Sequence, residues 1–151
     1  MSYRRGFTLI ETLLAIVIVA TLTLIGYPKV SRAMAQTNVQ SARTALANMF
    51  SKARAAATQT SRTTAVRLVG NTVFVTAKPR LTAAGASVID TVGTVLNLNT
   101  AYGVTLSTSV DSIGFDPRGL GSNFGTSTTI SVARSGHSQS ITVDGLGRVL
   151  K

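Results

Sequence analysis

The sequence predicts an α+β fold in which one long N-terminal helix packs against an antiparallel β-sheet. Three observations predict this fold. Residues 7–27 are almost entirely apolar, residues 42–57 repeat apolar side chains at spacings of three and four, and the pattern from residue 64 onward alternates with a period of two. The chain has 151 residues and no cysteine, so it can form one modest domain beside the apolar run, stabilised by packing alone.

The apolar run is long enough to cross a membrane. As a helix, residues 7–27 would span about 31 Å, close to the ~30 Å thickness of the hydrocarbon core of a bilayer. Arg4 and Arg5 come immediately before the run, and such positive charge keeps a short N-terminus in the cytoplasm. We therefore expect the residues after Pro28 to lie outside the cytoplasm.

Glu11 is the one charged residue in this run. A carboxylate at membrane depth costs on the order of 3 kcal/mol. A plain membrane anchor leaves this cost unexplained. A cleaved secretory signal ending at Ala33-Met34-Ala35 would have an unusually long apolar region with an internal carboxylate. Both interpretations leave Glu11 without a role.

The stretch Gly6-Phe7-Thr8-Leu9-Ile10-Glu11, followed by the apolar run, resembles the class III signal of type IV prepilins and type II secretion pseudopilins. The resemblance implies that prepilin peptidase cuts between Gly6 and Phe7 on the cytoplasmic side and N-methylates Phe7. It also implies that Glu11 meets the N-terminal ammonium of a neighbouring subunit as the helices stack, which neutralises the intramembrane charge. Pro28 stands where pilins commonly carry a proline that lets the packed helix bend.

The helical pattern continues beyond Pro28. The apolar stripe covers an arc of about 140° and consists of Ala42, Ala45, Leu46, Met49, Phe50, Ala53, Ala56 and Ala57. Arg43, Lys52 and Arg54 fall outside this arc, so we expect them to form a solvated flank. The helix is expected to end near Thr60, where β-branched residues take over.

The second half of the chain reads as short strands. Residues 64–69 and 72–77 flank Gly70-Asn71 and predict a hairpin. A second hairpin is predicted from residues 128–134 and 138–143 around Ser135-Gly136-His137, with four apolar side chains on one face: Ile130, Val132, Ile141 and Val143. Further strands are expected at residues 94–98, 104–107 and 112–116, and a surface loop at residues 78–93.

Two short sequence blocks in the second half of the chain extend the resemblance to a particular family of pilin-like proteins. Phe115-Asp116-Pro117-Arg118-Gly119 and Gly147-Arg148-Val149 are similar to recurring blocks of the GspH/FimT family of minor pilins and pseudopilins, whose β domain follows one long helix. The resemblance implies a low-copy structural subunit that assembles with other pilins. It would cross the bacterial inner membrane once, with its C-terminal domain extracytoplasmic, and would then enter a pilus or pseudopilus.

The chain is accordingly expected to divide into four parts. Residues 1–6 form the prepilin leader and residues 7–28 the transmembrane and assembly helix. Residues 29–62 form the amphipathic continuation of that helix, and residues 63–151 form a β-rich globular domain.

The charge of the chain supports an alternative, a DNA-binding minor pilin acting in DNA uptake. Fifteen basic and five acidic residues give a net charge of +10, and leaving out Arg4, Arg5 and Glu11 with residues 1–27 leaves +9. Some DNA-uptake members of the family carry a C-terminal Gly-Arg-x-Arg block, whereas this chain has Leu150 where the second arginine would stand. The candidate DNA contacts are Arg118, Arg134, Arg148 and Lys151.

The sequence offers no catalytic constellation. His137 is the only imidazole and is expected to be a solvated turn residue. The aspartates that could form a calcium site lack the alternating spacing of such a loop; they are Asp90, Asp111, Asp116 and Asp144. The two Gly-x-Gly triplets at residues 119–121 and 145–147 read as turns. We therefore expect no enzymatic activity, no metal and no cofactor.

Overall fold

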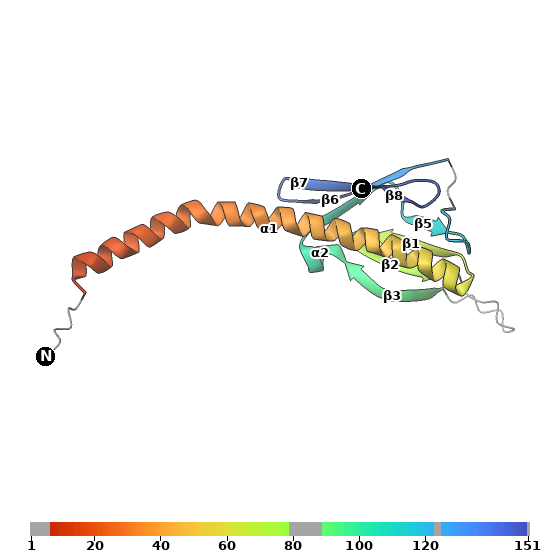
Figure 1. Cartoon of the computed structure of the whole chain (residues 1–151), viewed down its shortest axis with the longest axis horizontal. Coiled ribbons are helices and arrows are strands. Elements are labelled where there is room, and N and C mark those ends of the chain that lie inside the picture. The colour runs from red at the N-terminus through yellow and green to blue at the C-terminus, as the bar shows by residue number, and fades with distance from the viewer. Residues whose placement is uncertain (1–6, 79–88, 123–124, 151) are drawn as a thin grey trace. The chain divides into compact units, whose positions relative to one another are not determined.

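A computed structural model describes residues 7–78, 89–122 and 125–150 of the chain (Figure 1). The chain divides into two units, Met1–Met34 and Ala35–Lys151. We call the first unit the N-terminal segment and the second the β domain. Helix α1 (Leu9–Thr60) runs through both units, and the strands all belong to the β domain. The expected combination of a long helix with antiparallel sheet structure is confirmed.

The N-terminal segment is helical from Leu9 onward. Thr8 precedes the helix, and its carbonyl oxygen accepts hydrogen bonds from the backbone N–H groups of Glu11 and Thr12 at 3.1 and 3.2 Å. Threonine is a favoured residue at this position, where the first N–H groups of a helix lack partners. Among the described residues, α1 is the one helix long and apolar enough to cross a membrane, as judged by its length and composition. Pro28 lies inside it.

The C-terminal end of α1 explains why the helix stops at Thr60. Ser61 adopts a left-handed conformation with a φ of 51°, and the N–H of Arg62 donates to the carbonyl oxygen of Ala57 at 3.2 Å. This is the bonding pattern of a Schellman motif, which satisfies a carbonyl of the last turn and redirects the chain. The expected end of the helix is confirmed.

The strands of the described residues form two four-stranded sheets instead of the expected single sheet. The first has the order β3-β2-β1-β5, with β1 (Thr64–Val69), β2 (Thr72–Ala77), β3 (Asp90–Asn97) and β5 (Ser112–Phe115). The second has the order β4-β6-β7-β8, with β4 (Thr105–Thr108), β6 (Thr128–Arg134), β7 (His137–Val143) and β8 (Val149–Leu150). All neighbouring strands pair antiparallel.

A short helix, α2 (Leu98–Tyr102), separates the two sheets along the chain. The side chain of Asn97 caps its start by accepting from the N–H groups of Asn99 and Thr100, both at 3.0 Å. Gly103 ends it in a left-handed conformation. This helix was not expected from the sequence. It accompanies the division into two sheets, because β4, which follows α2, pairs with β6 instead of β3.

Both predicted hairpins are confirmed, and both have two-residue turns. Gly70 supplies a φ of 56° to the first turn, where Val69 pairs with Thr72. Ser135 and Gly136 have φ values of 47° and 82°, which is the left-handed pair required by a type I′ turn. Arg134 therefore pairs with His137. The expected three-residue turn is wrong, because His137 begins β7.

The limits of the shorter strands also differ from expectation. Strand β3 begins at Asp90, four residues before the expected start, and Leu98 belongs to α2. Gly93 and a register shift opposite β2 interrupt the alternation of β3, so its first half gave no period-two signal. The loop expected at residues 78–93 therefore included the first four residues of β3, which begins at Asp90. Residues 79–88 of the expected loop lie outside the described residues. Strand β8 was not predicted.

One face of α1 forms the core of the β domain. Its buried residues are Ala35, Val39, Ala42, Leu46, Ala47, Met49, Phe50, Ala53, Ala56 and Ala57. All of them except Ala35 and Ala56 form one cluster with the inward faces of both sheets, and Figure 1 shows this half of α1 running along β1 and β2. The expected stripe is confirmed except for Ala45, which is half-exposed while Ala47 is buried.

The core predicts a large cost for truncating Phe50, which is 1% exposed. We expect Phe50→Ala to lower the free energy of unfolding of the full chain in detergent micelles by about 3–5 kcal/mol, because it removes buried area and leaves a cavity. Lys52→Ala, an exposed position on the same helix, is the matched control and should change it by less than about 0.5 kcal/mol. Denaturant unfolding followed by circular dichroism measures both, and equal effects would show that Phe50 is not in the core.

Candidate functional site

Glu11 lies in the first turn of α1 and is exposed. Its N–H also approaches Oγ1 of Thr8 at 3.4 Å, so Thr8 and Glu11 have the spacing of a helix capping box. A carboxylate is favourable near the positive end of the helix dipole. Within the described residues, however, no cation pairs with the carboxylate of Glu11. Capping thus explains a preference for glutamate but not how its charge would be neutralised in a membrane.

The expected cleavage position lies at the edge of the described residues. Phe7 is described and is 79% exposed, whereas Gly6 lies outside the described residues. Leu9, Ile10 and the other large apolar side chains of the N-terminal segment are also exposed. This segment therefore presents apolar surface on all sides, as a helix surrounded by lipid or by other helices does.

Two loops of similar construction follow β5 and β7. Oδ1 of Asp116 accepts from the N–H groups of Arg118 and Leu120, both at 2.9 Å. Oδ1 of Asp144 accepts from the N–H groups of Leu146 and Arg148 at 3.1 and 2.7 Å. Each aspartate therefore closes its own loop. This role was not expected from the sequence, although a Gly-Leu-Gly triplet follows each of the two aspartates within three residues.

The two loops lie against each other, which brings together the two family blocks noted in the sequence. The N–H of Gly121 donates to the carbonyl oxygen of Leu146 at 3.0 Å. A Cβ atom on Gly121 would come within 2.6 Å of the backbone nitrogen of Gly147. A Cβ atom on Gly147 would come within 2.6 Å of the ring of Phe115. Both positions therefore require glycine for the loops to pack.

Arg54 of α1 connects the helix to both loops. Its Nη2 donates to the carbonyl oxygen of Gly147, and its guanidinium carbon lies 5.9 Å from the centre of the Phe115 ring, within the range of a cation–π contact. A Cβ atom on Gly119 would come within 2.9 Å of the Arg54 side chain. The expectation of a solvated flank is therefore wrong for Arg54.

Arg43 departs from that expectation in the same way. Its Nε donates to the carbonyl oxygen of Ser140 at 3.1 Å, and its Nη1 donates to Oε1 of Gln139 at 3.0 Å. Arg43 and Arg54 therefore hold α1 to β7 and to the loop that follows it. Of the three expected flank residues, Lys52 is the one that is exposed.

Two of the candidate DNA contacts, Arg134 and Arg148, lie apart from each other, and each has a partner within the chain. Nε of Arg148 pairs with Oδ2 of Asp144 at 2.7 Å, and Nη1 of Arg134 donates to the carbonyl oxygen of Tyr102 at 2.6 Å, at the end of α2. Arg134 lies beside the first residue of β7 and Arg148 follows its last residue, and the strand between them is about 20 Å long at ~3.3 Å per residue. The side chain of Arg118 is exposed, and Lys151 lies outside the described residues.

The ion pair with Arg148 changes the titration of Asp144. Partial burial raises the pKa of the Asp144 carboxyl, but the hydrogen bonds and positive charge of Arg148, together with the N–H of Leu146, outweigh it. The net effect is a pKa below the ordinary value of 3.8. The carboxylate therefore stays ionised and closes its loop until the pH falls through this lowered pKa.

Comparison with known proteins gives one match for the N-terminal residues and another for the fold. Residues 1–27 match the family model of the prokaryotic N-terminal methylation motif. The fold is similar to two crystal structures of the type IV minor pilin FimU of Pseudomonas aeruginosa. One is 18% identical with a TM-score of 0.58 and covers 76% of this chain and 87% of that chain. The other is 16% identical with a TM-score of 0.53 and covers 74% and 90%.

No curated protein sequence matches the chain. The chain thus joins a prokaryotic N-terminal methylation motif to a fold that is similar to that of a type IV minor pilin. The chain is therefore pilin-like in its N-terminal motif and in its fold, and its N-terminal helix is long and apolar enough to cross a membrane.

Arg54 should contribute to stability through the two loops. We expect Arg54→Met, which keeps most of the side-chain volume, to lower the free energy of unfolding by about 1–3 kcal/mol because the carbonyl of Gly147 loses a charged donor. Lys52→Met, two residues away and exposed, should have little effect. Denaturant unfolding of the full chain in micelles compares the two variants, and an equal loss in both would contradict the role given to Arg54.

Proposed function

We propose that this chain is a non-enzymatic minor pilin or pseudopilin subunit that assembles into a type IV pilus or a type II secretion pseudopilus. Prepilin peptidase would cut it between Gly6 and Phe7 and methylate Phe7, and α1 would anchor it in the bacterial inner membrane until assembly. The observation that carries the proposal is the joining of a methylation motif over residues 1–27 to a β domain with the fold of a minor pilin.

Glu11 would direct the assembly step. Its exposed carboxylate has no cationic partner among the described residues, and cleavage before Phe7 would create a new ammonium group on each subunit. Pairing of this group with Glu11 of a neighbour would neutralise both charges within the membrane. The pairing would also set the axial position of one helix against the next, because each Glu11 carboxylate would pair with one N-terminal ammonium group of a neighbouring subunit.

Helix α1 would transmit the movement of the filament to the β domain. The helix is continuous from Leu9 to Thr60, and its second half is held to both sheets by its buried face and by Arg43 and Arg54. A displacement of the assembled N-terminal segment would therefore be passed along the backbone of α1. A subunit that works in this way needs no catalytic group.

The geometry supports the DNA-uptake alternative less well. Arg134 and Arg148 are both engaged in intramolecular contacts, at opposite ends of β7. Arg118 is the one candidate among the described residues whose side chain makes no such contact. Charge alone gives weak, salt-sensitive and nonspecific DNA binding, so we base the proposal on assembly.

Processing is the first test of this proposal. We expect the mature chain purified from membranes to begin with N-methyl Phe7, as measured by mass spectrometry of its N-terminal peptide. Gly6→Leu should remain uncut, because a side chain would obstruct the extended backbone in the peptidase site. Ser2→Leu, within the leader, should still be cut. A mature chain that begins at Gln36 would instead indicate ordinary signal-peptide cleavage and would refute the proposal.

Loss of the Glu11 charge is the second test. We expect Glu11→Gln to be inserted and cut normally but to enter sheared filaments at least about tenfold less, because a charge that loses its desolvated partner costs several kcal/mol. Thr12→Ala, the neighbouring exposed position, serves as the control and should assemble normally. Quantitative immunoblotting of filament and membrane fractions measures the ratio. Normal incorporation of Glu11→Gln would remove the role assigned to this carboxylate.

A further inference from the structure

Two basic residues, Lys29 and Arg32, follow the apolar run of the N-terminal segment. Both belong to α1 and are exposed. Residues three apart on a helix lie on the same face, with Cβ atoms about 5–6 Å apart, so these two side chains can reach one group beside the helix. Neither side chain has an ion pair or a hydrogen bond within the described part of the chain. The pair is therefore available to an anion.

No acidic residue of the N-terminal segment lies close enough to neutralise this pair. Between Phe7 and Met34, Glu11 is the one other charged residue. Lys29 comes 18 residues after Glu11, which is about 27 Å along a helix at 1.5 Å per residue. The positive charge at this end of the apolar run is therefore uncompensated within the segment, which favours an anionic ligand.

The length of the apolar run places the pair at the level of the lipid headgroups. If Phe7 lies at one edge of the hydrocarbon core, Lys29 and Arg32 lie about 33 and 38 Å along the helix. The hydrocarbon core is ~30 Å thick, and the headgroup region extends about 5–8 Å beyond it on each side. Tyr27, which is 75% exposed, comes just before the pair, and tyrosine is enriched at the boundary between lipid and water.

The pair lies on the side of the membrane where basic residues are uncommon. Arg4 and Arg5 would keep the N-terminus in the cytoplasm, so Lys29 and Arg32 would lie outside it, where the positive-inside tendency disfavours cations. The proposed cleavage after Gly6 would also remove the two leader arginines. A specific anionic partner in the outer headgroup region would explain why two cations stand at this place.

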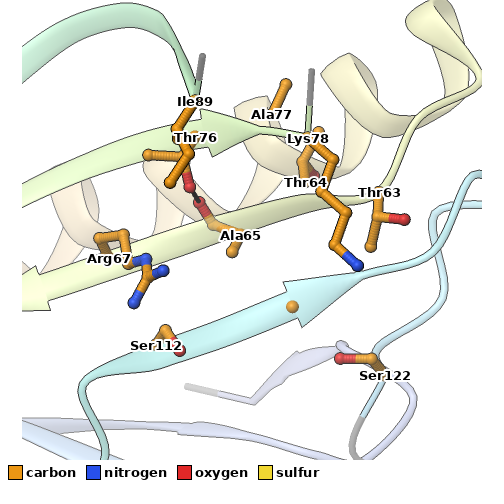
Figure 2. A pocket seen from close by; sticks show the side chains of 11 residues that line it. Thr63, Thr64, Ala65, Arg67, Thr76, Ala77, Lys78, Ile89, Ser112 and Ser122 are labelled. Atoms are coloured by element: carbon orange, nitrogen blue, oxygen red, sulfur yellow. Dashed lines mark hydrogen bonds between the residues drawn. The ribbon is translucent and has the colours of Figure 1, made fainter. Parts of the chain in front are cut away.

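The exposed cations of the first sheet are arranged differently. Figure 2 shows Arg67 on β1 and Lys78 after β2 at opposite ends of a groove. The N–H of Lys78 donates to the carbonyl oxygen of Thr63 at 2.9 Å, and Thr63 precedes Arg67 by four residues, or about 13 Å of extended backbone. These two cations therefore do not converge on one small group as a helical pair can.

We infer that Lys29 and Arg32 bind the phosphate group of an anionic phospholipid in the extracytoplasmic leaflet. The planar guanidinium of Arg32 would donate two parallel hydrogen bonds to phosphate oxygens, and the ammonium of Lys29 would donate a further charge-assisted hydrogen bond. Ile25, which is 63% exposed and one turn before Lys29 on the same face, would contact an acyl chain. The inference rests on the membrane anchoring proposed above and adds a lipid ligand to it.

Titration of the full chain in detergent micelles with dioleoyl phosphatidylglycerol, followed by native mass spectrometry, tests the inference. We expect this lipid to bind at least about tenfold more tightly than dioleoyl phosphatidylcholine, whose choline group offsets the phosphate charge. Lys29→Gln and Arg32→Gln should each weaken its binding by about tenfold. Glycerol 3-phosphate, which has a phosphate but no acyl chains, should bind at least about tenfold more weakly than the lipid.

Two controls separate a site from attraction to net charge. The double variant Ser31→Arg/Arg32→Ser keeps the net charge but places the cations two residues apart, where side chains do not face each other, so it should bind phosphatidylglycerol as weakly as Arg32→Gln. Arg67→Gln removes an exposed cation of the β domain and should bind as the unmodified chain does. Unchanged affinity in the double variant, or equal affinities for the two lipids, would overturn the inference.

Reconstitution into nanodiscs of phosphatidylcholine separates the lipid site from the anchoring on which it rests. The unmodified chain and Arg32→Gln should both co-elute with the nanodiscs, because the apolar run is intact in both. Insertion of the unmodified chain without a preference for phosphatidylglycerol would overturn the lipid site and leave the anchoring in place. Failure of the unmodified chain to insert would overturn both.

Discussion

The buried face of the second half of α1 is the surface on which the whole β domain depends. Within the part of the chain that the structure describes, the two sheets share no strand pairing, and few hydrogen bonds join them directly. Leu106 of β4 donates to Oδ1 of Asn71 in the β1–β2 turn at 2.8 Å, and Gly121 donates to Leu146 at 3.0 Å. Both sheets instead bury their inward side chains against the same helix face. Small residues such as Ala42 and Ala53, both 0% exposed, allow this close approach from two sides.

One helix thus serves two environments, and its composition changes accordingly along its length. The N-terminal segment exposes large apolar side chains on every side, which suits lipid or neighbouring helices, whereas the second half confines apolar residues to one face. Glu11 departs from the first pattern, and Arg43 and Arg54 depart from the second. In each case a charged group stands where a specific partner can hold the helix: within the chain for the arginines, and on a neighbouring subunit in the proposed filament.

Periodicity alone was enough to predict the helix, its end near Thr60 and both hairpins, because these features depend on residues close in sequence. The contacts of Arg54 could not be predicted, since its partner Gly147 lies 93 residues away and helical spacing places Arg54 outside the apolar arc. The division into two sheets was missed because α2 is only five residues long. The loops closed by Asp116 and Asp144 did carry a signal, the repeated Gly-Leu-Gly triplet, but it identified turns and not the contact between them.

Native-state hydrogen exchange of the full chain in detergent micelles tests most directly whether α1 is the shared core of both sheets. If both sheets depend on the helix, the slowest amides of β1 and β6 should open with the same free energy as those around Leu46, within about 1 kcal/mol. Leu46→Ala should then lower all three opening free energies together. Opening of β6 and β7 at a much lower free energy, unaffected by Leu46→Ala, would show that the second sheet opens independently of α1. This result would contradict the shared core.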